Sequence, residues 1–168
     1  ELFSEKQKKL HLHKKWKLND NFKKTASMKC YEHNIDRAVL TQIEFGVTSA
    51  CTFVDIDDVT QSAAYSAASF VKKKYKDTFD LKIACQTIKG VICRKQRLII
   101  EPWLSELDII GSLPAADGDM SKHLDIVMGW SKKYNKRLHV HVDQLNHPSE
   151  KETELLARKT IEWGLEDR

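Results

Sequence analysis

Two histidines, His139 and His141, stand two residues apart in an apolar run, a spacing that suits metal binding. Residues two apart on a β-strand project from the same face, so both imidazoles would be available to one ion. Imidazole nitrogen is a good ligand for zinc and for iron. The alternative interpretation is that one histidine is buried in the core while the other makes ordinary hydrogen bonds at its rim.

A second pair, His11 and His13, has the same spacing but lies between lysines. The surrounding residues favour a helix, in which side chains two positions apart face different directions. We therefore interpret His11 and His13 as solvated surface residues rather than as metal ligands.

Polar residues follow each of the apolar runs that we expect to be strands. Gln86 ends one of them, and its amide can both donate and accept hydrogen bonds. That property suits recognition of an amide or a pyrimidine edge, although such a side chain can equally tie down a loop. In parallel α/β folds the carboxyl ends of the strands meet at one rim, where function gathers. The other residues expected at this rim are Asp55, Asp57, Pro114, Asp117, His141, Asp143 and Gln144.

Strand and helix patterns alternate from residue 26 onward. Short apolar or β-branched runs predict strands over 47–54, 81–86, 108–113 and 138–142. Helical spacing predicts helices over 27–45, 59–76, 97–107 and 121–134, with Asp57 and Asp58 as caps of the second. A last helix would begin near Pro148, with Ser149 and Glu152 at capping-box spacing, and end at Gly164. Four strand-helix units with short connections predict a parallel sheet covered by helices.

The charge is moderate, with 28 Lys and Arg against 24 Asp and Glu in 168 residues. The basic residues concentrate in 6–24 and 72–76, but they lack interleaved aromatic residues or a nucleic-acid-binding motif. We interpret them as solvated helix faces and expect no nucleic-acid partner. No apolar run approaches the roughly 20 residues that span a bilayer, so we expect no membrane partner either.

Four cysteines, Cys30, Cys51, Cys85 and Cys93, show no close C-x-x-C pairing. Their apolar surroundings predict buried, reduced thiols, as in a cytoplasmic protein, rather than a disulfide framework or a zinc site made of cysteines.

Four segments resemble, in order and spacing, strands two to five of the cytosine deaminase-type amidohydrolases. The resemblance covers about residues 27 to 168. The segments are Phe45–Asp55, Asp80–Gln86 with Gly90, Asp108–Pro114 with Asp117, and Leu138–Gln144. The fold that this implies is α/β, a partial (β/α)8 TIM-type barrel of about four parallel βα units preceded by helices. A complete barrel takes about 250 residues, so this chain would form about half of one. The two expected parts are a basic helical segment over 1–25 and the partial barrel over 26–168.

The resemblance also implies a function. These enzymes hydrolyse C–N bonds of heterocyclic or amide-like small molecules through a water activated by a divalent metal, zinc or iron. His141 falls on a metal-ligand position of the family, and Gln86 on the glutamine that binds the amide edge of the substrate. The chain opens on Glu1 rather than Met, as the inside of a longer reading frame would. An open half-barrel exposes two sheet edges, so we also expect a homo-oligomer.

One departure from the family bears on catalysis. The acid/base glutamate of the family is replaced by Gln144, and an amide cannot shuttle a proton as a carboxylate does. Either Asp143 or Asp117 acts instead, or the reaction differs, or the chain is inactive. Of the four metal ligands that the family uses, only His141 has a counterpart. The alternative function is therefore a non-catalytic α/β module that binds a small heterocycle or a partner chain.

Overall fold

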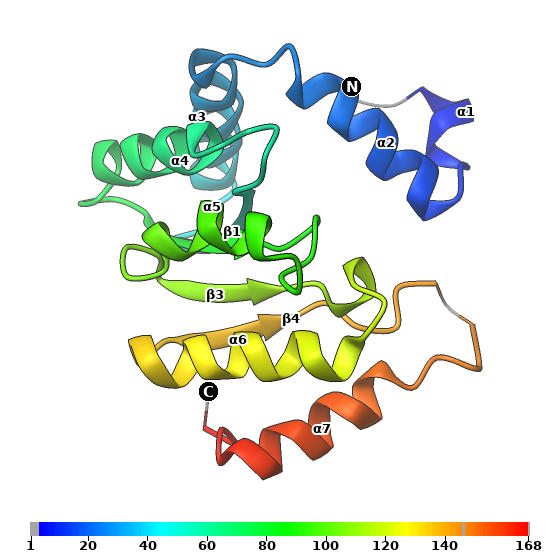
Figure 1. Ribbon diagram of the computed structural model, residues 1–168. Helices are drawn as coiled ribbons and strands as arrows, with labels where there is room; N and C mark the ends of the chain where they lie inside the picture. The colour runs from blue at the N-terminus through cyan, green and yellow to red at the C-terminus, as the bar shows by residue number, and fades with distance from the viewer. Residues whose placement is uncertain (1–3, 146, 168) are drawn as a thin grey trace.

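The structure is a computed structural model that describes residues 4–145 and 147–167 (Figure 1). Seven α-helices, four strands and two 3-10 helices follow one another in the described residues. The helices are α1 (Glu5–Lys8), α2 (Leu12–Lys23), α3 (Met28–Glu44), α4 (Ala63–Lys74), α5 (Arg94–Ile100), α6 (Met120–Tyr134) and α7 (Glu152–Trp163). The strands are β1 (Ser49–Asp55), β2 (Asp80–Gln86), β3 (Ile109–Ser112) and β4 (Arg137–Val140), with 3-10 helices over Glu101–Trp103 and Pro114–Ala116.

The four strands form one parallel sheet in the order β1-β2-β3-β4, with a helix between each pair. The register places Asp55 opposite Gln86 and Gly111 opposite His139, so the carboxyl ends of the strands lie at a common edge. This is the predicted partial barrel of four parallel βα units. The four predicted strands are all present, with ends that differ from the prediction by one or two residues.

One face of the sheet packs against helices and forms the core. The side chains directed at the helices include Val54, Ile83 and Ile110, each at most 5 % exposed. They form a cluster with residues of α4, α5 and α6, among them Ala68 and Val127. Removal of this apolar surface from water is the main stabilising contribution to the fold.

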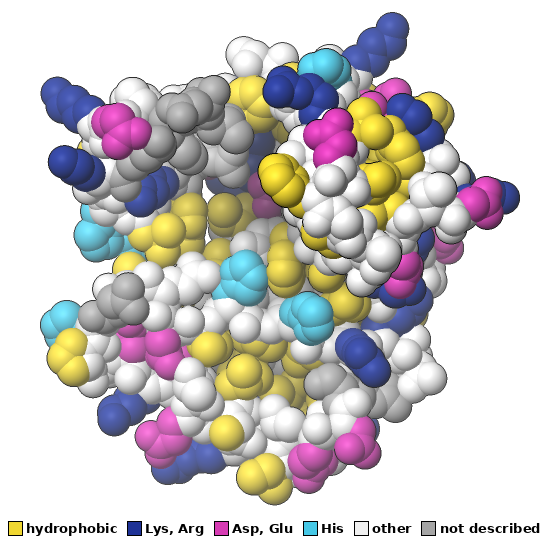
Figure 2. Space-filling view, turned by 180° about the vertical axis from the view of Figure 1, so that it is seen from behind, with side chains coloured by type: hydrophobic (Ala, Val, Ile, Leu, Met, Phe, Trp, Pro, Cys, Tyr) yellow, Lys and Arg dark blue, Asp and Glu magenta, His cyan; other side chains and the backbone are white. Residues whose placement is uncertain are grey.

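The opposite face of the sheet is open, and we call it the inner face because it would line the interior of a closed barrel. It carries Cys51, Phe53, Lys82, Gly111 and His139, which alternate with the core residues along the strands. Cys51, Lys82 and His139 are exposed. Figure 2 shows histidine side chains near the middle of the face seen from behind.

The N-terminal helices α1 and α2 lie beyond the carboxyl edge, on the side to which the strand arrows point in Figure 1. The helical prediction for 1–25 is confirmed from Glu5 onward, while residues 1–3 lie outside the described part. The interpretation of this segment as a solvated basic face is wrong for Lys23, which is only 4 % exposed. Lys23 is buried because it meets carboxylates at the end of β1.

Three helix predictions need correction. The helix expected over 59–76 is α4, which begins at Ala63 after Ser62, so Asp57 and Asp58 are not its caps. The helix expected over 97–107 is α5, which begins at Arg94 and ends at Ile100, before a 3-10 turn that contains Pro102. Pro102 has no backbone N–H to donate to the preceding turn, which explains the early end of the α-helical bonding. At α7 the expected Ser149–Glu152 capping box is absent, because Asp143 accepts the backbone N–H groups of this helix instead.

The cysteine prediction holds for one residue. Cys85 is fully buried, and burial raises the pKa of its thiol to about 12. Cys51 and Cys93 are exposed and Cys30 is half-buried, so the expectation of burial was wrong for these three. Cys51 is exposed because it lies on the inner face of the sheet, which only a closed barrel would cover. All four thiols are free.

Within the described residues, no helix is both long enough and apolar enough to cross a membrane.

Candidate functional site at the carboxyl edge of the sheet

His139 and His141 lie on the inner face, as their spacing predicts. Both rings approach Phe53 of β1, with centroid distances of 6.2 Å for His139 and 4.5 Å for His141. Burial lowers the pKa of His141, and the neighbouring His139 lowers it further. His141 is therefore neutral at pH 7, and neutral imidazole is the form that binds metals.

A metal centre made of the described residues alone would be incomplete. No group of three or more His, Cys, Asp or Glu side chains within 4–145 and 147–167 is placed to hold one ion. Zinc sites in proteins use three or four protein ligands. His139 and His141 would by themselves be an incomplete donor set, so a tightly bound ion would need ligands from outside the described residues.

Gln86 ends β2 on the inner face, beside Asp55 of β1. Its Oε1 atom is buried and has no hydrogen-bond partner among the described residues. A buried amide oxygen without a donor costs about 1–3 kcal/mol, so such atoms are rare in proteins unless a ligand or water completes them. Gln86 Oε1 can therefore accept a hydrogen bond at the carboxyl edge of the sheet. The family resemblance predicts substrate binding at this residue.

An ion cluster joins α2 to the end of β1. Lys23 Nζ lies 2.7 Å from Asp55 Oδ2, 2.9 Å from Asp57 Oδ2 and 3.4 Å from Asp20 Oδ1. Burial raises the pKa of Asp55, whereas at Asp57 hydrogen bonds from Thr60 and Lys23 outweigh burial and lower the pKa. The expected rim residues Asp55 and Asp57 thus bind Lys23, a residue that the sequence does not distinguish from its lysine neighbours.

Lys89, in the loop after β2, forms a further ion pair with Asp20 of α2. The Asp20 carboxylate thus neutralises Lys89 in the structure. Ion pairs therefore attach the loops after β1 and β2 to α2.

Asp143 is engaged as the cap of α7. Its carboxylate accepts the backbone N–H of Glu152 at 3.0 Å and of Thr153 at 3.3 Å, together with the Thr153 hydroxyl. The Thr153 hydroxyl, followed by these backbone donors, lowers the pKa of Asp143. To carry a proton in place of the missing glutamate, Asp143 would have to leave these bonds. Its assignment as a catalytic residue stays a prediction.

Asp117, the other alternative proton carrier, fixes two loops. It accepts the backbone N–H groups of Val91 and Ile92 at 2.7 and 3.2 Å, and its Oδ2 lies 2.7 Å from His123 Nδ1. The Nε2 atom of the same ring lies 2.9 Å from Ser112 Oγ. His123 and Ser112 are fully buried and closed to substrate, whereas the Asp117 side chain is 11 % exposed and lines a cavity. His123 was not among the residues predicted from the sequence to lie at the site.

Gln144, which takes the place of the family glutamate, lines a cavity of about 220 Å³ between α2 and the loops after β3 and β4. His141 is not among the residues that line this cavity. Its aromatic wall is formed by Trp16 and His13, whose rings meet edge to face at 5.0 Å. His13 is exposed, as expected, but it was not expected to line a cavity. Its ring also stacks on His11 at 5.4 Å, because His11 precedes the first turn of α2.

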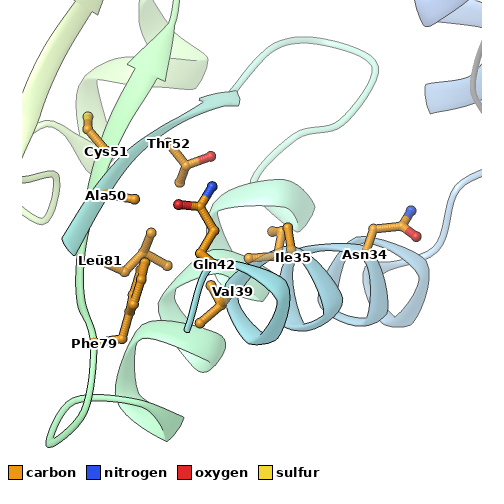
Figure 3. Close-up of a pocket in the computed structure, with 10 residues that line it drawn as sticks. Asn34, Ile35, Val39, Gln42, Ala50, Cys51, Thr52, Phe79 and Leu81 are labelled. Atoms are coloured by element: carbon orange, nitrogen blue, oxygen red, sulfur yellow. The ribbon is translucent and has the colours of Figure 1, made fainter. Parts of the chain in front are cut away.

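A second cavity, of about 260 Å³, lies between α3 and β1 (Figure 3). Ile35 and Val39 of α3 form one wall, and Ala50 and Leu81 of the strands form the other. β1 pairs only with β2, so its second edge has no strand beside it in the described residues. This groove therefore lies at the position that the next strand of a complete barrel would take.

Comparisons of sequence find a relative of the chain but no family. No protein-family model matches the chain. An uncharacterized protein of Haemophilus influenzae is 41 % identical over 162 residues, which are 94 % of this chain and 59 % of that protein. The chain thus spans less than two thirds of its curated relative.

Solved structures of two enzymes share the fold. The structure of 5-methylcytosine deaminase from Klebsiella pneumoniae with phosphonocytosine matches with a TM-score of 0.83 and 20 % identity, over 92 % of this chain and 38 % of that one. N-isopropylammelide isopropylaminohydrolase from Burkholderia multivorans matches with a TM-score of 0.65 and 21 % identity, over 71 % of this chain and 32 % of that one. The chain has the fold of a segment of an amidohydrolase-type enzyme, as the sequence resemblance predicted.

Proposed function

We propose that this chain is part of a hydrolase that cleaves a C–N bond in a heterocyclic or amide-like small molecule, by deamination or amide hydrolysis. The observation that carries the proposal is the position of His141 and Gln86. Both lie at the carboxyl edge of the inner face in a fold shared with deaminases, where Gln86 presents a buried amide oxygen without a partner.

In this proposal Gln86 binds the substrate. Its unpartnered Oε1 accepts an N–H of the amide or amidine edge, while its NH2 group donates to a ring or carbonyl acceptor. The two structures of the Klebsiella enzyme contain phosphonocytosine and 5-fluorocytosine, which carry such an edge. Phe53, in contact with His141, provides an apolar surface against which a flat ring can lie.

His141 is the proposed metal ligand. Its lowered pKa keeps it neutral and able to coordinate at neutral pH. A divalent ion, zinc or iron, would lower the pKa of a bound water and supply hydroxide as the nucleophile. The remaining ligands would have to come from residues outside the described part or from another chain, because the described residues offer no group of three.

The non-catalytic module is the second candidate. It is favoured by the residues at the positions where a proton carrier is expected, Asp143 and Gln144. Gln144 cannot transfer a proton as a glutamate does, and Asp143 is held as the cap of α7. In that case Gln86 and Phe53 would bind a heterocycle without hydrolysing it.

Metal content and ammonia release from cytosine and 5-methylcytosine, measured on the natural protein at its full length, test the proposal. We expect stoichiometric zinc or iron that is lost in His141→Ala, and ammonia release that is lost with it. Gln86→Ala should keep the metal and raise KM. His33→Ala, which removes an exposed histidine of α3, is the matched control.

Absence of both metal and hydrolysis in the full-length protein would contradict the enzyme proposal. Retained binding of cytosine by that metal-free protein would then support the non-catalytic module.

We also propose a homo-oligomer and a division of the chain into a basic helical N-terminal segment over 1–25 and a partial barrel over 26–168. The exposed inner face and the free edge of β1 support the first, and sedimentation velocity would measure it. The cytoplasmic location expected from the sequence stays a prediction.

A further inference from the structure

The cavity of about 220 Å³ beneath α2 has a composition unlike the rest of the chain. It is lined by two carboxylates, Asp117 and Glu152, and by the amide of Gln144, and none of its described lining residues is Lys or Arg. The whole chain, by contrast, carries 28 Lys and Arg against 24 Asp and Glu. The electrostatic potential of this cavity therefore favours a cation.

Glu152 contributes most to the preference of this cavity for a cation. It is 6 % exposed, and one oxygen, Oε2, accepts the backbone N–H of Asp143 at 3.0 Å. The structure gives its other oxygen, Oε1, no hydrogen bond to a described residue. Burial raises the pKa of Glu152, and repulsion from Asp143 and Glu150 raises it further, against the Asp143 N–H that lowers it. The carboxylate form of Glu152 has no cation among its described neighbours, so a cation bound in the cavity would stabilise that form.

The opposite side of the cavity is apolar and aromatic. Trp16 and Leu12 of α2 face Met120 at the start of α6 and Leu145 in the loop after β4. An indole face attracts cations, and a flat apolar wall suits a flat ring. Gln144 adds an amide oxygen that accepts no hydrogen bond from a described residue, so a second N–H of the ligand has an acceptor.

We propose that this cavity is a binding site for a small planar organic cation of the amidinium or guanidinium type, held between Trp16 and the carboxylate of Glu152. The parallel N–H groups of an amidinium match the two oxygens of a carboxylate, and such charge-assisted bonds are about twice as strong as neutral ones. The cavity includes neither His141 nor Gln86, so binding there does not require the proposed metal ligand, although Gln144 and Asp117 line it.

Benzamidinium is the probe, and neutral benzamide of nearly the same shape is its control. Calorimetric titration of the chain at pH 7 should show benzamidinium binding, with benzamide at least about tenfold weaker, a factor that corresponds to loss of a charged contact. In NMR spectra the Trp16 indole N–H and the Met120 methyl group should shift with benzamidinium.

Two variants locate the binding. Glu152→Gln should weaken benzamidinium binding at least about tenfold. Glu154→Gln removes the same charge from an exposed position of α7 that is paired with Arg158, and it should leave binding unchanged. Because Glu152 also accepts the Asp143 N–H, Trp16→Leu tests the opposite wall without touching that bond and should weaken binding too.

Equal binding of benzamidinium and benzamide would overturn the proposal. So would binding that is unchanged in both Glu152→Gln and Trp16→Leu, or shifts confined to residues outside the cavity. Failure of this site would leave the proposed hydrolysis untouched, since that is tested through His141 and Gln86.

Discussion

Lys23 Nζ lies 2.7 Å from Asp55 Oδ2 and 2.9 Å from Asp57 Oδ2, and this contact attaches α2 to the end of β1. Burial alone would lower the pKa of the Lys23 ammonium group, but the two carboxylates outweigh burial and raise it. The helix that covers the candidate site is thus held by a buried charge at its last turn.

Lys23→Met should be strongly destabilising. Removal of the ammonium group leaves Asp55 and Asp57 buried without a counter-charge, which costs on the order of 3–5 kcal/mol. Urea unfolding would measure the loss. Lys24→Met, at the exposed neighbouring position, is the control and should change the free energy of unfolding by less than about 0.5 kcal/mol. Equal effects of the two substitutions would contradict the assigned role of Lys23.

His123 should make the stability of the fold depend on pH. Burial lowers its pKa, although the Asp117 carboxylate opposes the shift. The unfolded chain therefore binds the His123 proton more readily than the folded chain. Its contribution to stability is complete above the unfolded pKa of about 6.5 and is lost as the pH falls below that value. Unfolding free energies at pH 7.5 and 5.5 would measure the difference.

A substitution isolates the His123 contribution. His123→Gln should lower stability at pH 7.5 because the bonds to Asp117 and Ser112 are impaired, but it should make the decline toward pH 5.5 shallower. His33→Gln, at an exposed position of α3, should leave the decline as it is. An unchanged slope in His123→Gln would rule out this residue as the source.

Gly111 should not tolerate a side chain. A Cβ atom at this position would lie 1.7 Å from the backbone oxygen of Cys85 and 3.0 Å from Phe53 Cδ1, so β2 and β3 would have to separate. Gly111→Ala should cost several kcal/mol, about 3 or more, since a clash with a buried strand cannot relax easily. Thermal unfolding would measure the loss.

Gly129→Ala is the opposite case. Gly129 lies within α6, and a Cβ there would meet only Trp163 at 3.8 Å, an ordinary contact. This substitution should raise stability by up to about 1 kcal/mol through helix propensity. A lower melting temperature in Gly129→Ala would show that the packing of α6 against α7 is tighter than the structure indicates.

Substitution of Gln86 should affect stability and ligand binding in opposite directions. Gln86→Leu removes a buried amide oxygen without a partner, so the free energy of unfolding should stay equal or rise by about 1 kcal/mol. Ligand binding by the full-length protein should be lost in the same variant. A strongly destabilised Gln86→Leu would instead indicate that the amide holds a loop, the alternative that the sequence left open.

Much of the fold could be predicted from the sequence because the signals are local. The apolar runs that end at Asp55, Gln86 and Ser112 gave the strands, and their alternation with helical patterns gave the parallel sheet. The H-x-H spacing placed His139 and His141 on one face, since strand geometry has a period of two. The errors at α5 and α7 arose where a proline and a distant cap decided the ends of helices.

The candidate site required the tertiary structure. Nothing local distinguishes Lys23 from its lysine neighbours, and its burial follows only from the position of α2 against Asp55 and Asp57. The same holds for Asp143, which lies nine residues from the Glu152 N–H that it caps, and for Trp16, which meets the loops after β3 and β4 only in the folded chain. The sequence by itself determined the strands and the facing of their side chains, because these depend on local periodicity. Which charges are paired and which cavity forms depend on long-range packing, and only the tertiary structure decided them.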